Sequence, residues 1–193
     1  MQKWNKQIPA IIEENVLKAL SFYPELKDTH ISFIFKKNIK SSVMQAQPVL
    51  KSLLNKKENR RYRINISALF KLTHSAIPIH QIPDDIMIGW IGHELGHIMD
   101  YETKSTFGMV GFGISYVLSD RFVKKAERIA DHYAISQGLG DYIVATKRFI
   151  LDHAELPQAY KDKIARLYLS PDDIVEQVLK LEEEKLREQK RNL

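Results

Sequence analysis

Apolar residues recur at helical spacing through much of the chain. An amphipathic pattern predicts a helix over residues 8–21. A longer apolar stretch that follows Asp84 and Asp85, two acidic residues suited to a helix start, predicts a second helix ending at Asp100. The second half of the chain continues this pattern, and we expect helices over residues 120–137, 141–152 and 157–169 and from Asp172 onward.

Three segments before residue 70 have the composition of strands. Residues 30–36 (HISFIFK) are rich in β-branched and aromatic side chains, and residues 62–67 (YRINIS) alternate polar with apolar positions. Residues 42–47 (SVMQAQ) give a weaker signal of the same kind. Together with the helices they predict an α+β fold with a small sheet ahead of the central helix.

The length of 193 residues fits one ordinary domain. We therefore expect a single domain over residues 1–193, long enough to bury a core. Charges of both signs alternate near the C-terminus (EEEKLREQKRNL), so residues 172–193 are expected to form a solvated helical tail.

Residues 107–118 (FGMVGFGISYVL) form an apolar run that holds three glycines. As a helix it would be roughly 18 Å long, too short for a bilayer core. The pattern favours a buried helix whose glycines allow close packing. A peripheral membrane hairpin or a flap facing a substrate is the alternative.

Composition limits the class of protein and the kind of metal site. Hydrophobic residues make up 44% and charged residues 27%, which is typical of soluble globular proteins. The N-terminal segment does not have the pattern of a signal peptide and no stretch is apolar enough to span a bilayer, so we expect a cytoplasmic protein. The chain has no cysteine, so a metal would have to be held by His, Asp or Glu.

The net charge of +5 is unevenly distributed. A basic stretch over residues 51–63 could meet nucleic acid or an anionic membrane surface. No nucleic-acid motif accompanies it, so we expect no nucleic-acid partner and interpret the stretch as a solvated loop leading into a strand. Its basic residues are Lys51, Lys56, Lys57, Arg60, Arg61 and Arg63.

The motif with the clearest chemistry is His93-Glu94-Leu95-Gly96-His97, which matches H-E-x-x-H. On a helix His93 and His97 project about 40° apart, one turn above the other, so both imidazoles can reach one ion. Glu94 points to the flank of the same face, where it can hold a water beside the metal. This arrangement is typical of zinc peptidases, in which a carboxylate moves the proton of the attacking water.

Catalytic zinc needs a third protein ligand. The downstream segment KKAERIADHYA places Glu127 and Asp131 four residues apart, hence on one face of a helix. Glu127 can complete a two-histidine, one-glutamate site. Asp131 can accept a hydrogen bond from the nitrogen of a ligand histidine that does not bind the metal.

HELGH followed by ERIAD and YA-x-x-x-G resembles the gluzincin metallopeptidases. Over residues 83–145 the chain is most similar to the HtpX-like and prenyl-protein endopeptidases and their minimal soluble relatives. The resemblance implies one zinc ion on His93, His97 and Glu127, with Glu94 as general base and acid and Asp131 as support. It also implies a mixed sheet whose edge strand, here residues 42–47, binds substrate by main-chain pairing.

The family also uses a later His, Tyr or Arg to stabilise the oxyanion. His153 is our first candidate for this catalytic role, with Arg166 in the same region of the chain. Tyr133, Tyr142 and Tyr160 are the alternatives.

The predicted function is hydrolysis of peptide bonds in a peptide or an unstructured protein. Two alternatives stay open. One is a zinc-binding interaction module of the same fold that no longer cleaves, and the other is a latent enzyme whose cleft is covered by the N-terminal helix or by residues 107–118. The sequence does not decide between endopeptidase and exopeptidase action.

Overall fold

The computed structural model describes residues 5–37, 39, 42–153 and 155–191. Its main sheet has the strand order β1-β2-β4-β3, in which β1, β2 and β4 are parallel and β3 is antiparallel to β4. The sheet is therefore mixed, and β3 is an edge strand. The strands are β1 (Lys6–Gln7), β2 (His30–Lys36), β3 (Met44–Pro48) and β4 (Arg61–Ser67), with a separate hairpin of β5 (Leu69–Lys71) and β6 (Ala76–Pro78).

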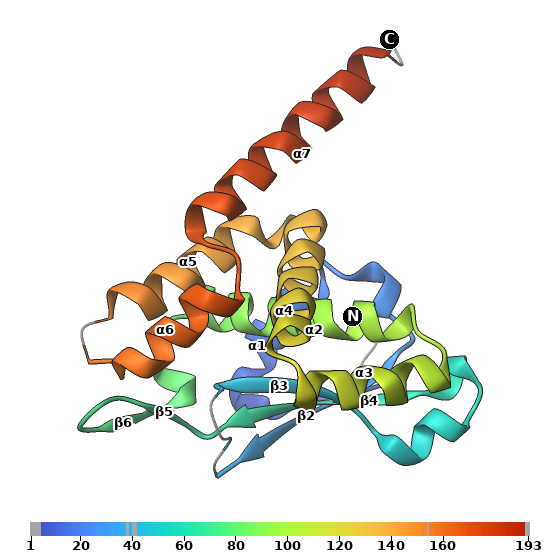
Figure 1. Ribbon diagram of the computed structural model, residues 1–193, viewed down its shortest axis with the longest axis horizontal. Coiled ribbons are helices and arrows are strands. Elements are labelled where there is room, and N and C mark those ends of the chain that lie inside the picture. The colour runs from blue at the N-terminus through green and yellow to red at the C-terminus, as the bar shows by residue number, and fades with distance from the viewer. Residues whose placement is uncertain (1–4, 38, 40–41, 154, 192–193) are drawn as a thin grey trace.

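Helices cover the sheet and make up most of the second half of the chain (Figure 1). The α-helices are α1 (Glu13–Leu20), α2 (Asp84–Glu102), α3 (Thr106–Leu118), α4 (Asp120–Ala134), α5 (Gly140–Asp152), α6 (Gln158–Leu167) and α7 (Pro171–Arg191). A π-helical turn, η6 (Ile135–Leu139), joins α4 to α5. Short 3₁₀ segments are η1 (Ala10–Ile12), η2 (Pro24–Leu26), η3 (Leu50–Leu54), η4 (Lys57–Asn59) and η5 (Ile79–Gln81).

Helix α2 is the centre of the structure. From Ile86 to Tyr101 every residue except Met99 is buried, as expected of a helix enclosed on all sides. It contacts α1, α4, α5 and the edge strand β3. The hydroxyl of Tyr23 donates a hydrogen bond to the carbonyl of Gly92 at 2.6 Å and so ties the segment after α1 to its middle. The motif histidines consequently lie in the core rather than on a surface helix.

Close packing between α2 and its neighbours depends on glycine. A Cβ added at Gly96 would lie 2.4 Å from the carbonyl oxygen of Ala130 on α4, and one added at Gly89 would lie 2.5 Å from the carbonyl oxygen of Tyr142 on α5. Both obstacles are backbone atoms, which cannot move aside as a flexible side chain can. The two glycines therefore set the distance at which α4 and α5 pack on α2.

Gly96→Ala is expected to destabilise the fold by about 1–3 kcal/mol, because its methyl group would push α4 away from α2. Gly111→Ala on α3 is the matched control: no atom lies within 4 Å of its added Cβ, so it should be neutral or stabilising by up to about 1 kcal/mol. Urea unfolding of the metal-free proteins measures both. Equal stability of the two variants would contradict the close contact between α2 and α4.

The predicted elements are largely confirmed. The α+β fold is present, the strand over residues 30–36 matches β2, and the weak strand signal over residues 42–47 corresponds to the edge strand β3. The helix expected over residues 120–137 ends at Ala134 and continues as η6, where Gly138 adopts a φ of +91°. The expected C-terminal tail forms the mostly exposed helix α7, which projects from the body (Figure 1), and residues 192–193 of it lie outside the described residues.

The prediction that residues 107–118 are buried is wrong. They form a helix, but only Met109 and Phe112 of α3 are buried. The helix lies at the outside of the molecule, and the rest of the protein covers one of its faces. Apolar side chains also occupy its other faces, which are exposed. Among the described residues no helix is long and apolar enough to cross a membrane.

Candidate metal centre

Two imidazoles and one carboxylate converge between α2 and α4. The Nε2 atoms of His93 and His97 lie 3.0 and 3.2 Å from Oε2 of Glu127. One ligand atom from each residue lies within 4.8 Å of the others, and all three side chains are buried. The structure thus brings together the three residues that the sequence predicts as metal ligands.

Asp131, one turn after Glu127 on α4, holds His93 in place. Its Oδ1 accepts a hydrogen bond from Nδ1 of His93 at 2.8 Å and lies 3.1 Å from the ammonium group of Lys147 on α5. Its Oδ2 accepts from the backbone N–H of Leu169 at 3.2 Å. Asp131 is fully buried, and these three donors compensate for the loss of water around its charge. The hydrogen bond between Asp131 and His93 is the contact that the sequence predicts, and support of a bound metal by Asp131 stays a prediction.

The donor set fits a metal ion. In the neutral form of His93 whose Nδ1–H donates a hydrogen bond to Asp131, Nε2 carries a lone pair. That lone pair faces Oε2 of Glu127, which also only accepts hydrogen bonds when ionised. Two acceptors at 3.0 Å need a positive charge between them, which either a proton on His93 or a bound metal ion supplies. Two imidazole nitrogens and a carboxylate oxygen are ligands that suit zinc.

The electrostatics of the group favour a bound cation. Burial would raise the pKa of Glu127, but His97 and the hydrogen bond from His93 outweigh it and hold the pKa well below its ordinary value. Burial would likewise raise the pKa of Asp131, but Lys147 and then His93 lower it. Burial would lower the pKa of His93, whereas Asp131 and Glu127 raise it to about 9. Both carboxylates are ionised, and the position between His93 and Glu127 attracts positive charge.

Glu94 contacts the edge strand of the sheet. Its Oε2 accepts a hydrogen bond from the backbone N–H of Ala46 on β3 at 2.5 Å, and the hydroxyl of Tyr101 donates to the carbonyl of the same residue at 3.2 Å. Burial raises the pKa of Glu94, while the nearby histidines oppose this shift. Glu94 is therefore a buried carboxylate beside the metal ligands with a raised affinity for a proton, which is the property required of a general base that later acts as an acid.

Tyr116 is a residue of the site that the sequence did not reveal. Its hydroxyl, on α3, donates a hydrogen bond to Oε1 of Glu127 at 2.5 Å. Oε1 is the oxygen that does not face the histidines, so this bond fixes the rotation of the carboxylate. Tyr116 lies near the end of the apolar run over residues 107–118, where helical spacing puts it on the same face as Met109 and Phe112. No metal-ligand spacing marks it.

Tyr116→Phe is expected to weaken metal binding at this group by about 10–100-fold, the usual effect of removing a partner that orients a ligand. Competition against a chromophoric chelator measures the affinity. Tyr133→Phe on α4 is the matched control and should bind zinc like the unmodified protein. If Tyr116→Phe keeps full affinity, the hydrogen bond does not hold Glu127 in its ligand position.

A groove of about 840 Å³ opens onto the ligands. Glu94, His97 and Glu127 line it together with the edge strand β3. Part of α3 and the segment around Leu50 and Leu53 form another wall, which is largely apolar. The groove therefore connects the edge strand β3 with the metal group.

The structure does not bring His153 to this group. Its ring lies at the end of α5 against Phe149 and Phe70, with centroid distances of 5.3 and 6.4 Å, and it lines neither of the two pockets that contain Glu94. His153 lies close in sequence to the region expected to stabilise the oxyanion. It is not close in space, because α5 ends beside the β5–β6 hairpin. His153 is an aromatic packing residue at this position rather than a neighbour of the metal ligands.

The alternative oxyanion candidates lie in different places. Tyr160 lines a small pocket together with His93 and Glu94, and its pKa is raised by burial and by the charges of Glu94 and Glu127. Arg166 borders the large groove but forms an ion pair with Asp120 at 2.6 Å. Tyr142 packs edge-on against Phe22. Of these residues, Tyr160 is the one that shares a pocket with both His93 and Glu94.

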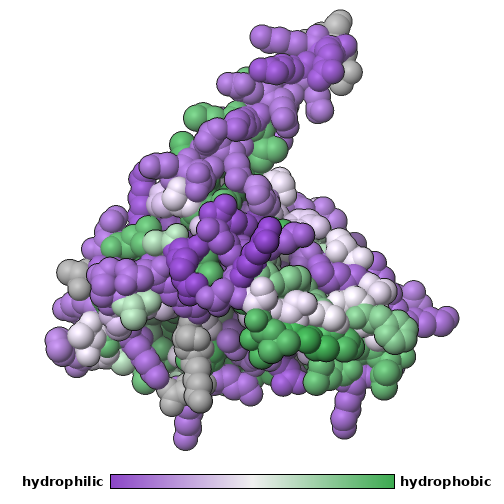
Figure 2. Space-filling model, in the orientation of Figure 1, coloured by the Kyte–Doolittle hydropathy of each residue, from purple (hydrophilic) through white to green (hydrophobic). Residues whose placement is uncertain are grey.

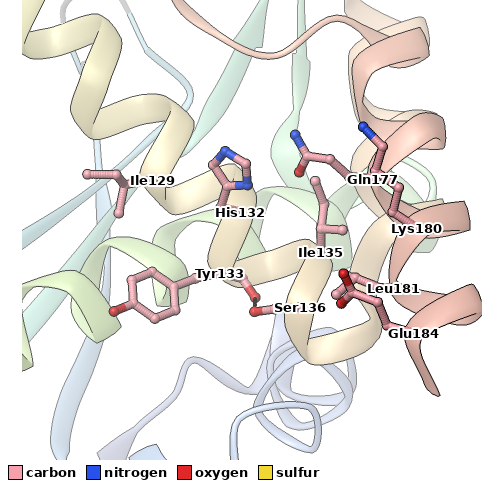
Figure 3. A pocket seen from close by; sticks show the side chains of 9 residues that line it. All are labelled: Ile129, His132, Tyr133, Ile135, Ser136, Gln177, Lys180, Leu181 and Glu184. Atoms are coloured by element: carbon pink, nitrogen blue, oxygen red, sulfur yellow. Dashed lines mark hydrogen bonds between the residues drawn. The ribbon is translucent and has the colours of Figure 1, made fainter. Parts of the chain in front are cut away.

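Tyr133 lines a separate pocket, of about 370 Å³, between α4, η6 and α7 (Figure 3). His132 and Ile135 from the same segment and Gln177 and Lys180 of α7 line it as well. Neither the metal ligands nor Glu94 borders this pocket. Tyr133 and His132 therefore belong to the face of α4 turned away from the metal group.

No protein-family model, curated protein or solved structure matches the chain.

Proposed function

We propose that the protein is a zinc-dependent peptidase of the gluzincin type. The observation that carries the proposal is the buried group of His93, His97 and Glu127, with Glu94 between the two histidines in sequence and facing the same groove. Two imidazoles and one carboxylate leave one position of a tetrahedral zinc site for water or substrate. A zinc ion held there supplies a Lewis acid that polarises a carbonyl group and acidifies water.

Glu94 performs the proton transfers. Its carboxylate takes a proton from the attacking water, and its burial favours keeping that proton until the amine leaves. The same proton then passes to the leaving nitrogen, so that the peptide bond breaks without release of an amide anion. Tyr160, beside His93 and Glu94, takes the place of His153 as the candidate that donates to the developing oxyanion.

The edge strand β3 orients the substrate in this proposal. The N–H and carbonyl groups of Ala46 point to the free edge of the sheet, since they contact Glu94 and Tyr101 rather than β4. An extended peptide that pairs with β3 exchanges these contacts for main-chain hydrogen bonds and releases Glu94 to meet water. Pairing by backbone suits an unstructured protein as substrate, because it makes few demands on sequence.

A latent form of the same enzyme has one specific observation in its favour. Helix α3 reaches the metal group from outside through the bond from Tyr116 to Glu127, and it forms one wall of the groove. A shift of α3 would therefore change both access to the groove and the position of a ligand. Activity that rises when α3 is displaced or deleted would distinguish this form from a constitutive peptidase.

The proposed function is tested by incubating purified, zinc-loaded protein with a reduced and denatured protein and following the fragments by mass spectrometry. We expect cleavage that stops when the zinc is removed by a chelator and returns when zinc is added back. If the protein binds one zinc per chain but cleaves no unfolded protein, it is a metal-binding module, and the peptidase assignment is overturned.

A further inference from the structure

The outer face of α3 and the adjacent segment η3 form a continuous hydrophobic patch. Phe107, Val117 and Leu118 of α3 are 89%, 81% and 78% exposed, and Leu54 and Leu50 of η3 are 88% and 75% exposed. Among the described residues these are the five most exposed large hydrophobic side chains. Figure 2 shows this hydrophobic area over α3 and the segment beneath it. Patches of this kind on a folded protein mark interaction surfaces.

The patch belongs to well-anchored structure. The hydroxyl of Thr106 donates a hydrogen bond to the carbonyl of Leu53 at 2.9 Å. The buried guanidinium of Arg60 donates to the carbonyl of Lys104 at 2.7 Å and to the Thr106 hydroxyl at 3.2 Å. These bonds join the start of α3 to η3 and to Arg60, the residue before β4. The hydrophobic side chains are therefore held outward by a fixed scaffold.

Basic residues flank the patch on both sides in sequence. Residues 50–61 hold five basic residues and one acidic residue, and α3 itself has no charged residue. Lys51, Lys56, Lys57 and Arg61 are exposed. After α3, Asp120 pairs with Arg166, while Arg121, Lys124 and Lys125 on α4 are exposed.

We propose that this surface binds the anionic face of a lipid bilayer, with α3 lying in the interface. An apolar helix face bordered by Lys and Arg matches the two attractions that hold peripheral proteins on membranes, insertion among acyl chains and attraction to anionic headgroups. Helix α3 has 13 residues and is about 20 Å long, so it lies along the surface rather than crossing it.

The charges favour lipid over a second copy of the chain. In a two-fold dimer built on this patch, the lysines around η3 of one copy would meet the same set on the other, and like charges would repel. An anionic bilayer instead neutralises all of them at once. If the proposed peptidase function holds, docking also places the groove, whose wall includes α3, next to the lipid surface. The binding itself depends neither on zinc nor on hydrolysis.

Vesicle flotation tests the proposal. The whole protein is mixed with vesicles of pure phosphatidylcholine or of phosphatidylcholine with phosphatidylserine, and the bound fraction is measured at low and high salt. We expect binding to the anionic vesicles that falls with salt. Leu54→Ser/Phe107→Ser should reduce it by roughly tenfold or more, since two large apolar groups no longer insert. Lys56→Glu/Lys57→Glu should reduce binding to anionic vesicles in the same way.

Matched controls come from α7. Leu179→Ser/Leu186→Ser removes two exposed leucines, and Lys185→Glu/Lys190→Glu reverses two exposed lysines, both away from the patch. These variants should bind like the unmodified protein, and thermal unfolding confirms that every variant is folded. The proposal is overturned if the protein binds neither kind of vesicle, if binding ignores the patch substitutions, or if those substitutions abolish self-association instead.

Discussion

Glu94→Gln is expected to keep one zinc per chain and to lose peptide hydrolysis by about 10²–10⁴-fold, the usual contribution of a general base and acid. The amide has nearly the size of the carboxylate, but it cannot take a proton from water. Because Glu94 is not among the three converging ligands, the metal should stay. The measurement pairs zinc analysis with the rate of cleavage of a denatured protein.

The matched control for this result is Glu182→Gln, the same chemical change at an exposed position of α7. It should retain full zinc and full activity. Full activity in Glu94→Gln would contradict the assigned proton transfer, whereas loss of both zinc and activity would mean that Glu94 helps to hold the metal.

Removing one of the three ligands should lower the affinity for zinc itself, which Glu94→Gln should leave unchanged. His97→Ala or Glu127→Ala is expected to lower zinc affinity by more than about 100-fold, beyond the effect of losing an orienting partner, because two protein donors hold the ion where three did before. Glu127 has the larger structural consequence, since its Oε2 lies between the two imidazoles. Equilibrium dialysis against buffered zinc measures the loss.

His132→Ala is the control for the ligand variants, because His132 lies on α4 but lines the separate pocket next to α7. It should bind zinc like the unmodified protein. Unfolding in the absence of metal shows whether Glu127→Ala is folded. A folded Glu127→Ala that binds zinc with unchanged affinity would exclude the carboxylate as a ligand.

The sequence predicts the ligand group because helical periodicity alone fixes much of its geometry. His93 and His97 share a face of α2 at i, i+4 spacing, and Glu127 and Asp131 share a face of α4 for the same reason. The glycine at position 96 then lets the two faces approach. Helical periodicity does not predict that these faces of α2 and α4 lie against each other, because that depends on the tertiary fold.

Sequence patterns do not predict contacts between residues of distant elements. Tyr116 reaches Glu127 from α3, Lys147 reaches Asp131 from α5, and Ala46 meets Glu94 from an edge strand. None of these pairs has a fixed spacing in the chain, since each depends on how whole elements pack. His153 shows the converse, because its nearness in sequence to the expected region did not place it near the ligands.

The exposure of α3 has a similar cause. The apolar character of residues 107–118 correctly predicts an uncharged helix. Hydrophobicity alone does not predict how much of the helix surface other elements cover. At the edge of the molecule the body covers only the side with Met109 and Phe112. The remaining apolar faces therefore became an exposed surface rather than core.

The position of the metal is the central claim, and anomalous diffraction at the zinc absorption edge from crystals of the zinc-loaded protein tests it most directly. We predict one peak per chain, about 2.0–2.2 Å from Nε2 of His93, Nε2 of His97 and a carboxylate oxygen of Glu127. A peak elsewhere, or a zinc site in which Glu127 is turned away and nothing replaces it, would contradict the account.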